Sequence, residues 1–477
     1  MPSLSTIASD AQAAGQGHLL AAAERLEGDA RASFIAQLDA IDFERVPRWI
    51  ERYVRAVEPE AVPESLEPAP YYPNDPSSAA NPWDADTCRD AGARLIAAGK
   101  VACFTVAGGQ GSRLGYDGPK GCYPAGCVTN KPLFQVFAEG IRSTIDRYGA
   151  PVPWYVMTSP LNHDATVAFF VEHAHFGLDP SDVMFFPQGT MPSMDKDTGR
   201  ILLAAPGTIA TNPDGHGGAI RALAESGAVE DMHKRGVEHV SYFQVDNPHA
   251  KVADPVFLGL HAVAPDSSGE FSSKMVAKSS WDEKVGVFCK ADGRCRVIEY
   301  SDLPEALAKE TRADGSIRFN AGSIAIHAIS VDFIGKLASD AAYELPFHRA
   351  VKKVAHVDAE TGEAIEPAEP NAVKLERFIF DAIPLAESSI VYETDRVEEF
   401  APIKNATGSD SVETSRALQT ERAARWLEAA GVTVPRHADG SVNATIEIGA
   451  MTALDADHLR QRGGLPDAIE PGAKVTL

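Results

Sequence analysis

The sequence lacks the features of several large classes of protein. It has only 44 Lys and Arg against 67 Asp and Glu, a net charge of -23, which excludes general binding to nucleic acids or to an anionic membrane. No stretch approaches the roughly 18 uninterrupted apolar residues of a membrane span, and no basic n-region precedes the first apolar residues. These absences favour a cytoplasmic protein, and they leave room for a local basic site that binds a small phosphate.

Cysteines are few and internal repeats are absent. The six cysteines are too sparse for a disulfide scaffold and form no paired CxxC pattern for a metal, so we expect reduced thiols. With 477 residues, 44% of them hydrophobic, the chain is long enough for two or three domains with a large buried core. The composition predicts an ordinary globular protein.

A proline-rich stretch at 58–76 is the clearest boundary, because proline is excluded from helix interiors and biases the residue before it to extended backbone. The residues before it, 5–56, are rich in Ala, Leu, Glu and Arg, and their apolar residues recur near helical spacing. We therefore expect a helical N-terminal segment with its proline-rich linker over 1–94, a large domain over 95–395 and a small C-terminal domain over 396–477.

From about residue 95, short apolar strands alternate with helical segments, which predicts βαβ units around a mixed, mostly parallel sheet. The expected strands are VACFTV, PVPWYVMTS, DVMFFPQ and HVSYFQVD, and the helical segments include LFQVFAEGIRSTIDRY and GGAIRALAESGAVEDMHKRG. A β-rich insertion follows at about 270–330, with Ala291-Asp292-Gly293 as a hairpin turn. The fold class is α/β, with a helix near 411–431 and a strand-like region after it in an α+β or β module at the C-terminus.

The glycine-rich stretch VAGGQGSRLGYDGPK, residues 106–120, follows the first of these strands. Ligands of open α/β sheets bind at the carboxyl ends of strands, so the stretch is either a phosphate cradle or only a flexible turn. It does not match the dinucleotide fingerprint, which needs glycine where Leu114 stands, and the chain contains no GxxxxGK[ST] sequence. As a cradle, its backbone amides would approach a phosphate, with Arg113 and Lys120 supplying charge.

GGxGxRLG followed by PK resembles the signature of the UDP-sugar pyrophosphorylases, and other blocks over about 95–410 are similar to blocks of that family in the same order. VDNPHAKVADP, VIEYSDL and KLERFIFD resemble the UDP-N-acetylhexosamine branch most; the other similar blocks are FPQG, PDGHGG, FNAG and PIKNA. The resemblance implies a Rossmann-like nucleotidyltransferase that forms a UDP-sugar and pyrophosphate from UTP and a hexose 1-phosphate. N-acetylglucosamine 1-phosphate is the first choice of sugar.

Two other activities and one non-catalytic function stay open. At some positions the chain resembles the enzymes of this family that use glucose 1-phosphate or that accept several sugars. A catalytically silent sensor of nucleotide sugars would have the same fold. A dehydrogenase is disfavoured because the dinucleotide fingerprint is incomplete. Retention of the full set of triphosphate cations argues against the sensor.

The same resemblance implies a set of site residues. Those for the nucleotide are Ala107, Gly108, Gly109, Gln110, Gly111, Gln188 and Gly215. The catalytic cations are Arg113, Lys120 and Lys404, and the sugar phosphate would be bound by His216, Asn320, Gly322 and Lys374. Nucleotidyl transfer consists mostly of positioning and charge neutralisation, so no nucleophilic side chain is required.

Asp246 ends an apolar strand, and a carboxylate there suits Mg²⁺, although an Asp before Asn-Pro is also a common turn residue. Asp254 is open between a ligand and a helix cap. Two residues depart from the acetylhexosamine pattern, since His216 stands where that branch usually has Asn and Ala277 where it has Glu. The identity of the sugar therefore depends on these two positions and on Asn320.

Overall fold

The structure is a computed structural model that describes residues 4–56, 63, 65–79, 81–340 and 344–477. The chain forms two compact units. Unit 1 comprises Met1–Ala61, Gly189–Gly218 and Glu344–Ile379, and unit 2 comprises Val62–Gln188, Ala219–Tyr343 and Phe380–Leu477. The predicted boundaries at 94/95 and 395/396 stay a prediction. Part of the proline-rich stretch, residues 58–62 and 64, lies outside the described residues.

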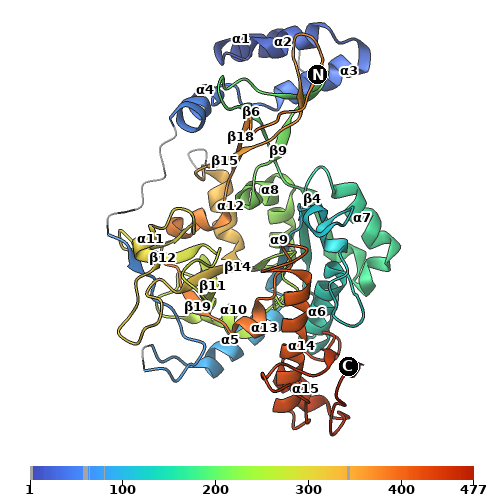
Figure 1. Ribbon diagram of the computed structural model, residues 1–477, viewed down its shortest axis with the longest axis vertical. Coiled ribbons are helices and arrows are strands. Elements are labelled where there is room, and N and C mark those ends of the chain that lie inside the picture. Colours follow the sequence, from blue (N-terminus) through green and yellow to red (C-terminus); the bar gives the residue numbers. More distant parts are fainter. Residues whose placement is uncertain (1–3, 57–62, 64, 80, 341–343) are drawn as a thin grey trace. The chain divides into compact units, whose positions relative to one another are not determined.

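Unit 2 is built on a ten-stranded sheet whose centre is parallel (Figure 1). Four strands lie in the order β10-β2-β3-β4 and run the same way; they are β10 (His239–Gln244), β2 (Val101–Val106), β3 (Trp154–Thr158) and β4 (Val183–Pro187). Each coincides with an apolar run expected to be a strand. The two inner strands β2 and β3 are buried at nearly every position, as their continuous hydrophobic character requires.

The other side of this sheet is antiparallel. It contains β14 (Ala321–Ser330), which pairs antiparallel with β10, and the strands β11 (Phe271–Ala277), β12 (Val287–Ala291), β13 (Arg294–Ile298), β19 (Val391–Glu393) and β1 (Glu67–Pro68). The hairpin between β12 and β13 turns at Asp292 and Gly293, both with positive φ. The predicted mixed sheet and hairpin are confirmed.

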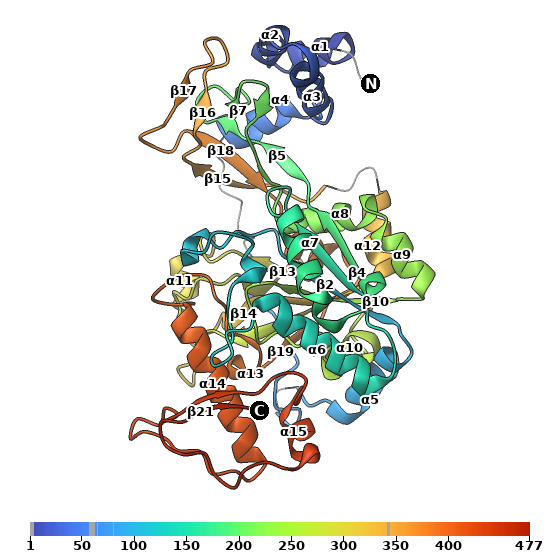
Figure 2. The same cartoon turned by 90° about the vertical axis from the view of Figure 1, so that its right-hand side faces the viewer.

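Helices lie on both sides of this sheet (Figure 2). They are α5 (Ala85–Ala97), α6 (Leu133–Tyr148), α7 (His163–Glu172), α8 (Ala219–Glu225), α9 (Ala228–Arg235), α10 (Pro255–Val263), α11 (Glu305–Ala308) and α12 (Val331–Ser339). α5 and α10 pack backbone against backbone, since a Cβ at Gly92 would lie 1.9 Å from the Pro255 oxygen and one at Gly259 would lie 1.7 Å from the Cys88 oxygen. Residues 217–236, which read as one helical stretch, form two α-helices.

The C-terminal part of unit 2 has a hydrophobic cluster of its own, around Trp426, Leu427, Ile446 and Leu459. Its elements are α13 (Arg396–Glu399), α14 (Val412–Ala429), α15 (Ala456–Arg462) and the parallel pair β20 (Thr445–Glu447) and β21 (Lys474–Thr476). α14 begins at Ser411, whose hydroxyl accepts a hydrogen bond from the Thr414 amide in a capping box. The expected helix is confirmed, while the expected strand-like region contains only β20.

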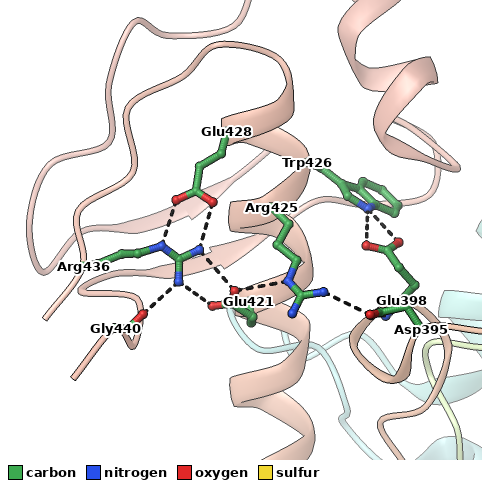
Figure 3. A network of polar contacts seen from close by, with 8 residues as sticks. All are labelled: Asp395, Glu398, Glu421, Arg425, Trp426, Glu428, Arg436 and Gly440. Carbon is green, nitrogen blue, oxygen red and sulfur yellow. Dashed lines mark hydrogen bonds and ion pairs between the residues drawn. The ribbon is translucent and has the colours of Figure 1, made fainter. Parts of the chain in front are cut away.

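Ion pairs and hydrogen bonds hold these elements together (Figure 3). The guanidinium of Arg436 bridges the carboxylates of Glu421 and Glu428, with contacts of 2.8 to 3.1 Å. On the other side of α14, Arg425 lies 3.1 Å from Asp395 of the segment before α13. The ion pair between Arg425 and Asp395 therefore joins the C-terminal module to the segment that follows β19 of the large sheet.

Unit 1 combines N-terminal helices with three small sheets. Its helices are α1 (Leu4–Ala13), α2 (Gly17–Glu24), α3 (Gly28–Asp39), α4 (Val46–Trp49) and a π-helix (Ile50–Arg55), which confirms the helical N-terminal segment. Its strands are β5 (Thr190–Pro192), β6 (Met194–Asp195), β7 (Leu203–Ala205), β8 (Thr208–Ile209), β9 (Thr211–Pro213), β15 (His348–Lys352), β16 (His356–Val357), β17 (Ala364–Ile365) and β18 (Ala372–Glu376). Phe34 and Leu38 share a cluster with Val373 and Leu375, so helices and strands have a common core.

No helix among the described residues is long and apolar enough to cross a membrane.

Candidate active site

The glycine-rich loop, residues 107–120, folds back on itself at the carboxyl end of β2. The Gly111 amide donates to the Gly118 oxygen at 2.9 Å, and the Lys120 amide donates to the Gly109 oxygen at 3.0 Å. These bonds bring Lys120 beside the start of the loop, although it stands eleven positions after Gly109 along the chain. The loop is therefore a closed structure with a defined conformation.

The side chain of Asn162 supports the first turn of this loop through hydrogen bonds to its backbone. Its buried side-chain amide donates to the oxygens of Ala107 and Gly109 at 3.0 and 3.2 Å, and its side-chain oxygen accepts from the Ser159 amide at 2.7 Å. These two carbonyl oxygens of the loop are thereby satisfied from the protein side. The amides of Ala107 and Gly111 donate to the oxygens of Met157 and Gly118, so the amides of residues 108–110 are the ones available to a ligand. Sequence reasoning missed Asn162; its only signal is an Asn shortly after a strand that neighbours β2.

Gln188 follows β4, and its buried side chain lies against the same loop. A Cβ at Gly108 would lie 2.8 Å from the Gln188 side-chain oxygen, so only glycine allows this approach. The backbone amide of Gln188 donates to the backbone oxygen of Thr158 at 2.8 Å, which fixes the chain where β3 and β4 end. Loop and amide side chain are close neighbours, and the uracil contact of Gln188 stays a prediction.

Asp246 and Lys120 face each other at this edge of the sheet. Asp246 stands two residues after β10, whose parallel neighbour is β2, and its carboxylate lies 3.5 Å from the Lys120 ammonium. Both side chains are largely buried, with exposed fractions of 14% and 15%. The strands thus bring together an anion and a cation that are 126 positions apart in sequence.

The donor set around Asp246 fits Mg²⁺ only in the presence of a phosphate ligand. Within the described ranges, no group of three or more His, Cys, Asp or Glu side chains is placed to hold a metal ion by itself. Mg²⁺ takes one or two carboxylates, and completes its shell with phosphate oxygens and water. A single carboxylate beside a cradle of amides is compatible with that pattern.

The other predicted cations differ in their surroundings. The Ile403 backbone amide donates to the backbone carbonyl oxygen of Asp246 at 2.8 Å, so the backbone next to Lys404 lies against Asp246. The Lys404 ammonium itself lies 3.2 Å from the Asp410 carboxylate. Arg113 is exposed in the loop, and the structure gives it no ion-pair partner among the described residues.

Asn320 and Gly322 lie at the start of β14. Because β14 runs antiparallel to β10, this start lies at the same edge of the sheet as Asp246. The Asn320 side-chain oxygen accepts a hydrogen bond from Arg312 at 3.0 Å. Ala277, at the end of the neighbouring β11, pairs in register with Ala321, so the position without the expected Glu lies next to Asn320.

The remaining candidates belong to unit 1. Gly215 has a φ of +85°, and a Cβ there would lie 2.3 Å from the Arg377 oxygen. His216 accepts a hydrogen bond from the Ile379 amide at Nδ1 and stacks on Phe378 at 5.1 Å. Burial, followed by the nearby His348, lowers the pKa of His216 to about 4, so its ring is neutral near pH 7.

Lys374 is the central residue of β18, opposite Ala350, and is partly buried. In the parts of the chain that the structure covers, it has no ion-pair partner within 4 Å. Its role at the sugar phosphate stays a prediction.

Asp254 is a helix cap, as one of its two interpretations expected. Its carboxylate accepts from the Val256 amide at the start of α10 at 3.0 Å, and it lies 2.6 Å from the buried Lys274 ammonium. These contacts occupy the carboxylate within the protein.

The profile of the UTP–glucose-1-phosphate uridylyltransferase family matches residues 80–431. The chain belongs to this family. It is 38% identical over 381 residues to the UDP-N-acetylglucosamine pyrophosphorylase of Saccharomyces cerevisiae, a match that covers 78% of each chain. It is 37% identical to the human UDP-N-acetylhexosamine pyrophosphorylase-like protein 1, over 89% of this chain and 87% of that one.

Among solved structures, the UDP-N-acetylglucosamine pyrophosphorylase of Trypanosoma brucei, in complex with an inhibitor, is similar over 98% of both chains, with a TM-score of 0.81 and 27% identity. The fold and the family predicted from the glycine-rich loop and its companion blocks are confirmed. The protein is an enzyme of the nucleotidyltransferase type, and its family uses UTP and a sugar 1-phosphate.

Proposed function

We propose that this protein transfers the uridylyl group of UTP to N-acetylglucosamine 1-phosphate, which yields UDP-N-acetylglucosamine and pyrophosphate. The observation that carries the proposal is the pairing of Lys120 with Asp246 beside the closed glycine-rich loop, in a chain of this family. The names of its relatives in yeast and Trypanosoma brucei favour the acetylated sugar.

The reaction forms one P–O bond and breaks another. An oxygen of the sugar phosphate attacks the α-phosphorus of UTP, the bond from that phosphorus to the bridging oxygen breaks, and pyrophosphate leaves with the electron pair. Charge accumulates on the leaving pyrophosphate, where a cation such as Lys120 stabilises it more in the transition state than in the ground state. We assign the triphosphate to Lys120, Arg113 and the loop 107–111, whose amides at 108–110 are its donors, and the α-phosphate to Lys404.

We assign Mg²⁺ to Asp246, whose carboxylate would hold the ion; bound there, it would neutralise part of the charge of the phosphates. The Asp246 carboxylate also lies 3.5 Å from the Lys120 ammonium. Lys120 therefore serves as the counter-ion that orients this partly buried carboxylate toward the loop.

The remaining residues divide between the base and the sugar. We assign Gln188 and Gly215 to uracil, since an amide side chain both donates and accepts at a pyrimidine edge. His216, Asn320, Gly322 and Lys374 are assigned to the sugar phosphate. His216 accepts a hydrogen bond from the Ile379 amide at Nδ1, so the proton of its neutral ring lies on Nε2, and His216 is no acid near pH 7. A cytoplasmic location stays a prediction from the sequence.

The test is a matrix of initial rates of pyrophosphate release. UTP, ATP, CTP, GTP and dTTP are each combined with N-acetylglucosamine, N-acetylgalactosamine, glucose and galactose 1-phosphates in the presence of Mg²⁺. We expect the highest kcat/KM with UTP and N-acetylglucosamine 1-phosphate. A preference for glucose 1-phosphate would overturn the choice of sugar, and binding of UDP-sugars without any turnover would replace the enzyme by a sensor.

A further inference from the structure

Unit 2 contains a cavity of about 350 Å³ that is separate from the candidate active site. Its walls come from α6, from the segment 248–256, from α14 and from the segment 447–455. None of the residues assigned to nucleotide, sugar phosphate or metal lines it. Its volume lies within the range of about 300 to 1,000 Å³ that is usual for sites of small organic ligands.

Aromatic side chains supply much of the apolar wall. They come from four separate elements or segments of unit 2 and are Trp83, Phe137, Tyr148, Tyr392 and Trp426. The Trp426 indole N–H donates to the Glu398 carboxylate at 2.9 Å, which fixes its ring, as Figure 3 shows. Such faces bind flat apolar groups by stacking and edge contacts.

Most charged side chains of the wall have a partner of opposite charge. These pairs are Lys131–Glu139 at 2.8 Å, Arg147–Asp455 at 2.9 Å, Asp254–Lys274 at 2.6 Å and Lys251–Glu399 at 3.5 Å. Glu447, although without a cation, accepts from the amides of Val128 and Thr129 at 2.7 and 2.9 Å. Carboxylates of the wall are thus satisfied within the protein.

Arg422 of α14 is different. In the part of the chain described, no carboxylate lies within 4 Å of its guanidinium, and its one hydrogen bond is a 3.4 Å contact with the Glu398 oxygen. The Glu398 carboxylate is directed at Trp426 (Figure 3). Burial lowers the pKa of Arg422 to about 10, although the carboxylates of Glu398 and Glu399 act in the opposite direction, so the group remains charged near neutral pH. Its side chain is half-buried and has no direct ion pair within the described chain.

Arg425, the next arginine of α14, differs from Arg422 because it has ion-pair partners. Arg425, one turn along α14, lies 3.1 Å from Asp395 and 3.3 Å from Glu421 (Figure 3). Arg89, the other cation of the cavity wall without a partner among the described residues, is exposed to solvent. Arg422 is therefore the half-buried cation, without a direct ion pair among the described residues, to which an anion in the cavity would bind.

We propose that this cavity binds a small organic monoanion, a carboxylate with a flat apolar body. The planar guanidinium of Arg422 takes the carboxylate through two parallel hydrogen bonds, and the aromatic side chains take the body. A single negative charge matches the wall, whose five Lys and Arg side chains exceed its four carboxylates, Glu139, Asp254, Glu447 and Asp455, by one. UTP and the sugar phosphate carry more charge than this and are not the expected occupants.

Isothermal titration calorimetry of the full-length protein with 1-naphthoate tests the proposal, with the uncharged isostere 1-naphthamide as the comparison. We expect 1-naphthoate to bind at one site at least tenfold more tightly than 1-naphthamide. Arg422→Met is expected to remove this preference, while the matched variant Arg425→Met, which lies on the same helix outside the cavity, retains it.

A second variant keeps the test decisive if Arg422→Met fails to fold. Ala450 lines the cavity and is partly exposed, so Ala450→Trp should fill the cavity and abolish binding without a lower midpoint of thermal unfolding. Saturating UTP should leave the affinity for 1-naphthoate unchanged. Equal affinity for acid and amide, binding that persists in Ala450→Trp, displacement by UTP, or absence of binding would each overturn the proposal.

Discussion

At the scale of single residues, the site depends on side chains whose partners are distant in sequence. Lys120 faces Asp246 at 3.5 Å, and Asn162 bonds the backbone of Ala107 and Gly109. A charged or amide group held in this way loses little orientational freedom when a ligand binds, which is the condition for electrostatic stabilisation of a transition state.

Lys120→Ala and Asp246→Ala each remove one member of the facing pair. Because the charge that develops on pyrophosphate would lose its stabilisation, we expect kcat to fall by a factor of about 100 or more in either variant. Initial rates of pyrophosphate release measure the effect. Lys100→Ala, which removes an exposed ion pair with Glu238, should leave the rate unchanged, and wild-type rates in both site variants would refute the assignment.

Asn162→Asp tests the support of the loop without a change of side-chain size. The variant keeps the acceptor for the Ser159 amide but replaces the group that donates to the loop oxygens. We expect the KM for UTP to rise at least tenfold, and the free energy of unfolding to fall by about 1 to 3 kcal/mol. Asn81→Asp, which loses a similar bond to the Tyr71 oxygen, is the control, and an unaltered KM in Asn162→Asp would contradict a positioning role.

The protonation of His216 is measurable by NMR titration. Its pKa in the folded protein, about 4, lies below the ordinary value of 6.5, so its contribution to stability is complete above about pH 6.5 and is lost as the pH falls toward 4. We expect the unfolding free energy to decline over this window, and less steeply in His216→Asn. A measured pKa near 6.5 would contradict the buried, neutral imidazole.

At the scale of elements, a buried ion cluster joins β11, α10 and α13. Lys274 of β11 is fully buried, with its ammonium 2.6 Å from Asp254 at the start of α10 and 2.5 Å from Glu399 of α13. Burial raises the pKa of Asp254, but the ammonium groups of Lys274 and Lys251 lower it by more, so the pKa lies well below its ordinary value. The carboxylate is thus charged throughout the neutral range.

Lys274→Met leaves two buried carboxylates with one cation fewer. We expect the free energy of unfolding to fall by about 3 to 5 kcal/mol, since an uncompensated buried charge is more costly than the absence of the whole pair. Urea unfolding followed by circular dichroism measures this loss. The control Lys336→Met, with a side chain 68% exposed and 3.5 Å from Glu270, should change stability by less than about 0.5 kcal/mol, and an equally small change in Lys274→Met would contradict the account.

At the scale of the whole molecule, the apolar runs were sufficient to predict the parallel centre of the sheet, and local turn signals predicted the β12–β13 hairpin. Short-range patterns report only local structure. They could not reveal that Gly189–Gly218 and Glu344–Ile379 form one unit with the N-terminal helices, because such an association depends on contacts between distant segments.

Side chains with unusual roles were equally hidden in the sequence. Lys274 stands in KMVAKSS, where a lysine reads as a solvated residue, and its burial follows only from the position of Asp254 and Glu399. Asn162 and Arg422 have no local pattern at all, since their significance comes from the loop and the cavity that they face. Asp246 and Lys120 could be singled out because each stands in a short block of its own; the structure brings them within 3.5 Å of each other, and their roles stay a prediction.

The stoichiometry of products from a single reaction tests the central claim most directly. With UTP, N-acetylglucosamine 1-phosphate and Mg²⁺, ³¹P NMR should show one UDP-N-acetylglucosamine and one pyrophosphate formed for each UTP consumed. Release of orthophosphate and UDP, or no consumption of UTP with any of the four sugar 1-phosphates, would contradict uridylyl transfer by this protein.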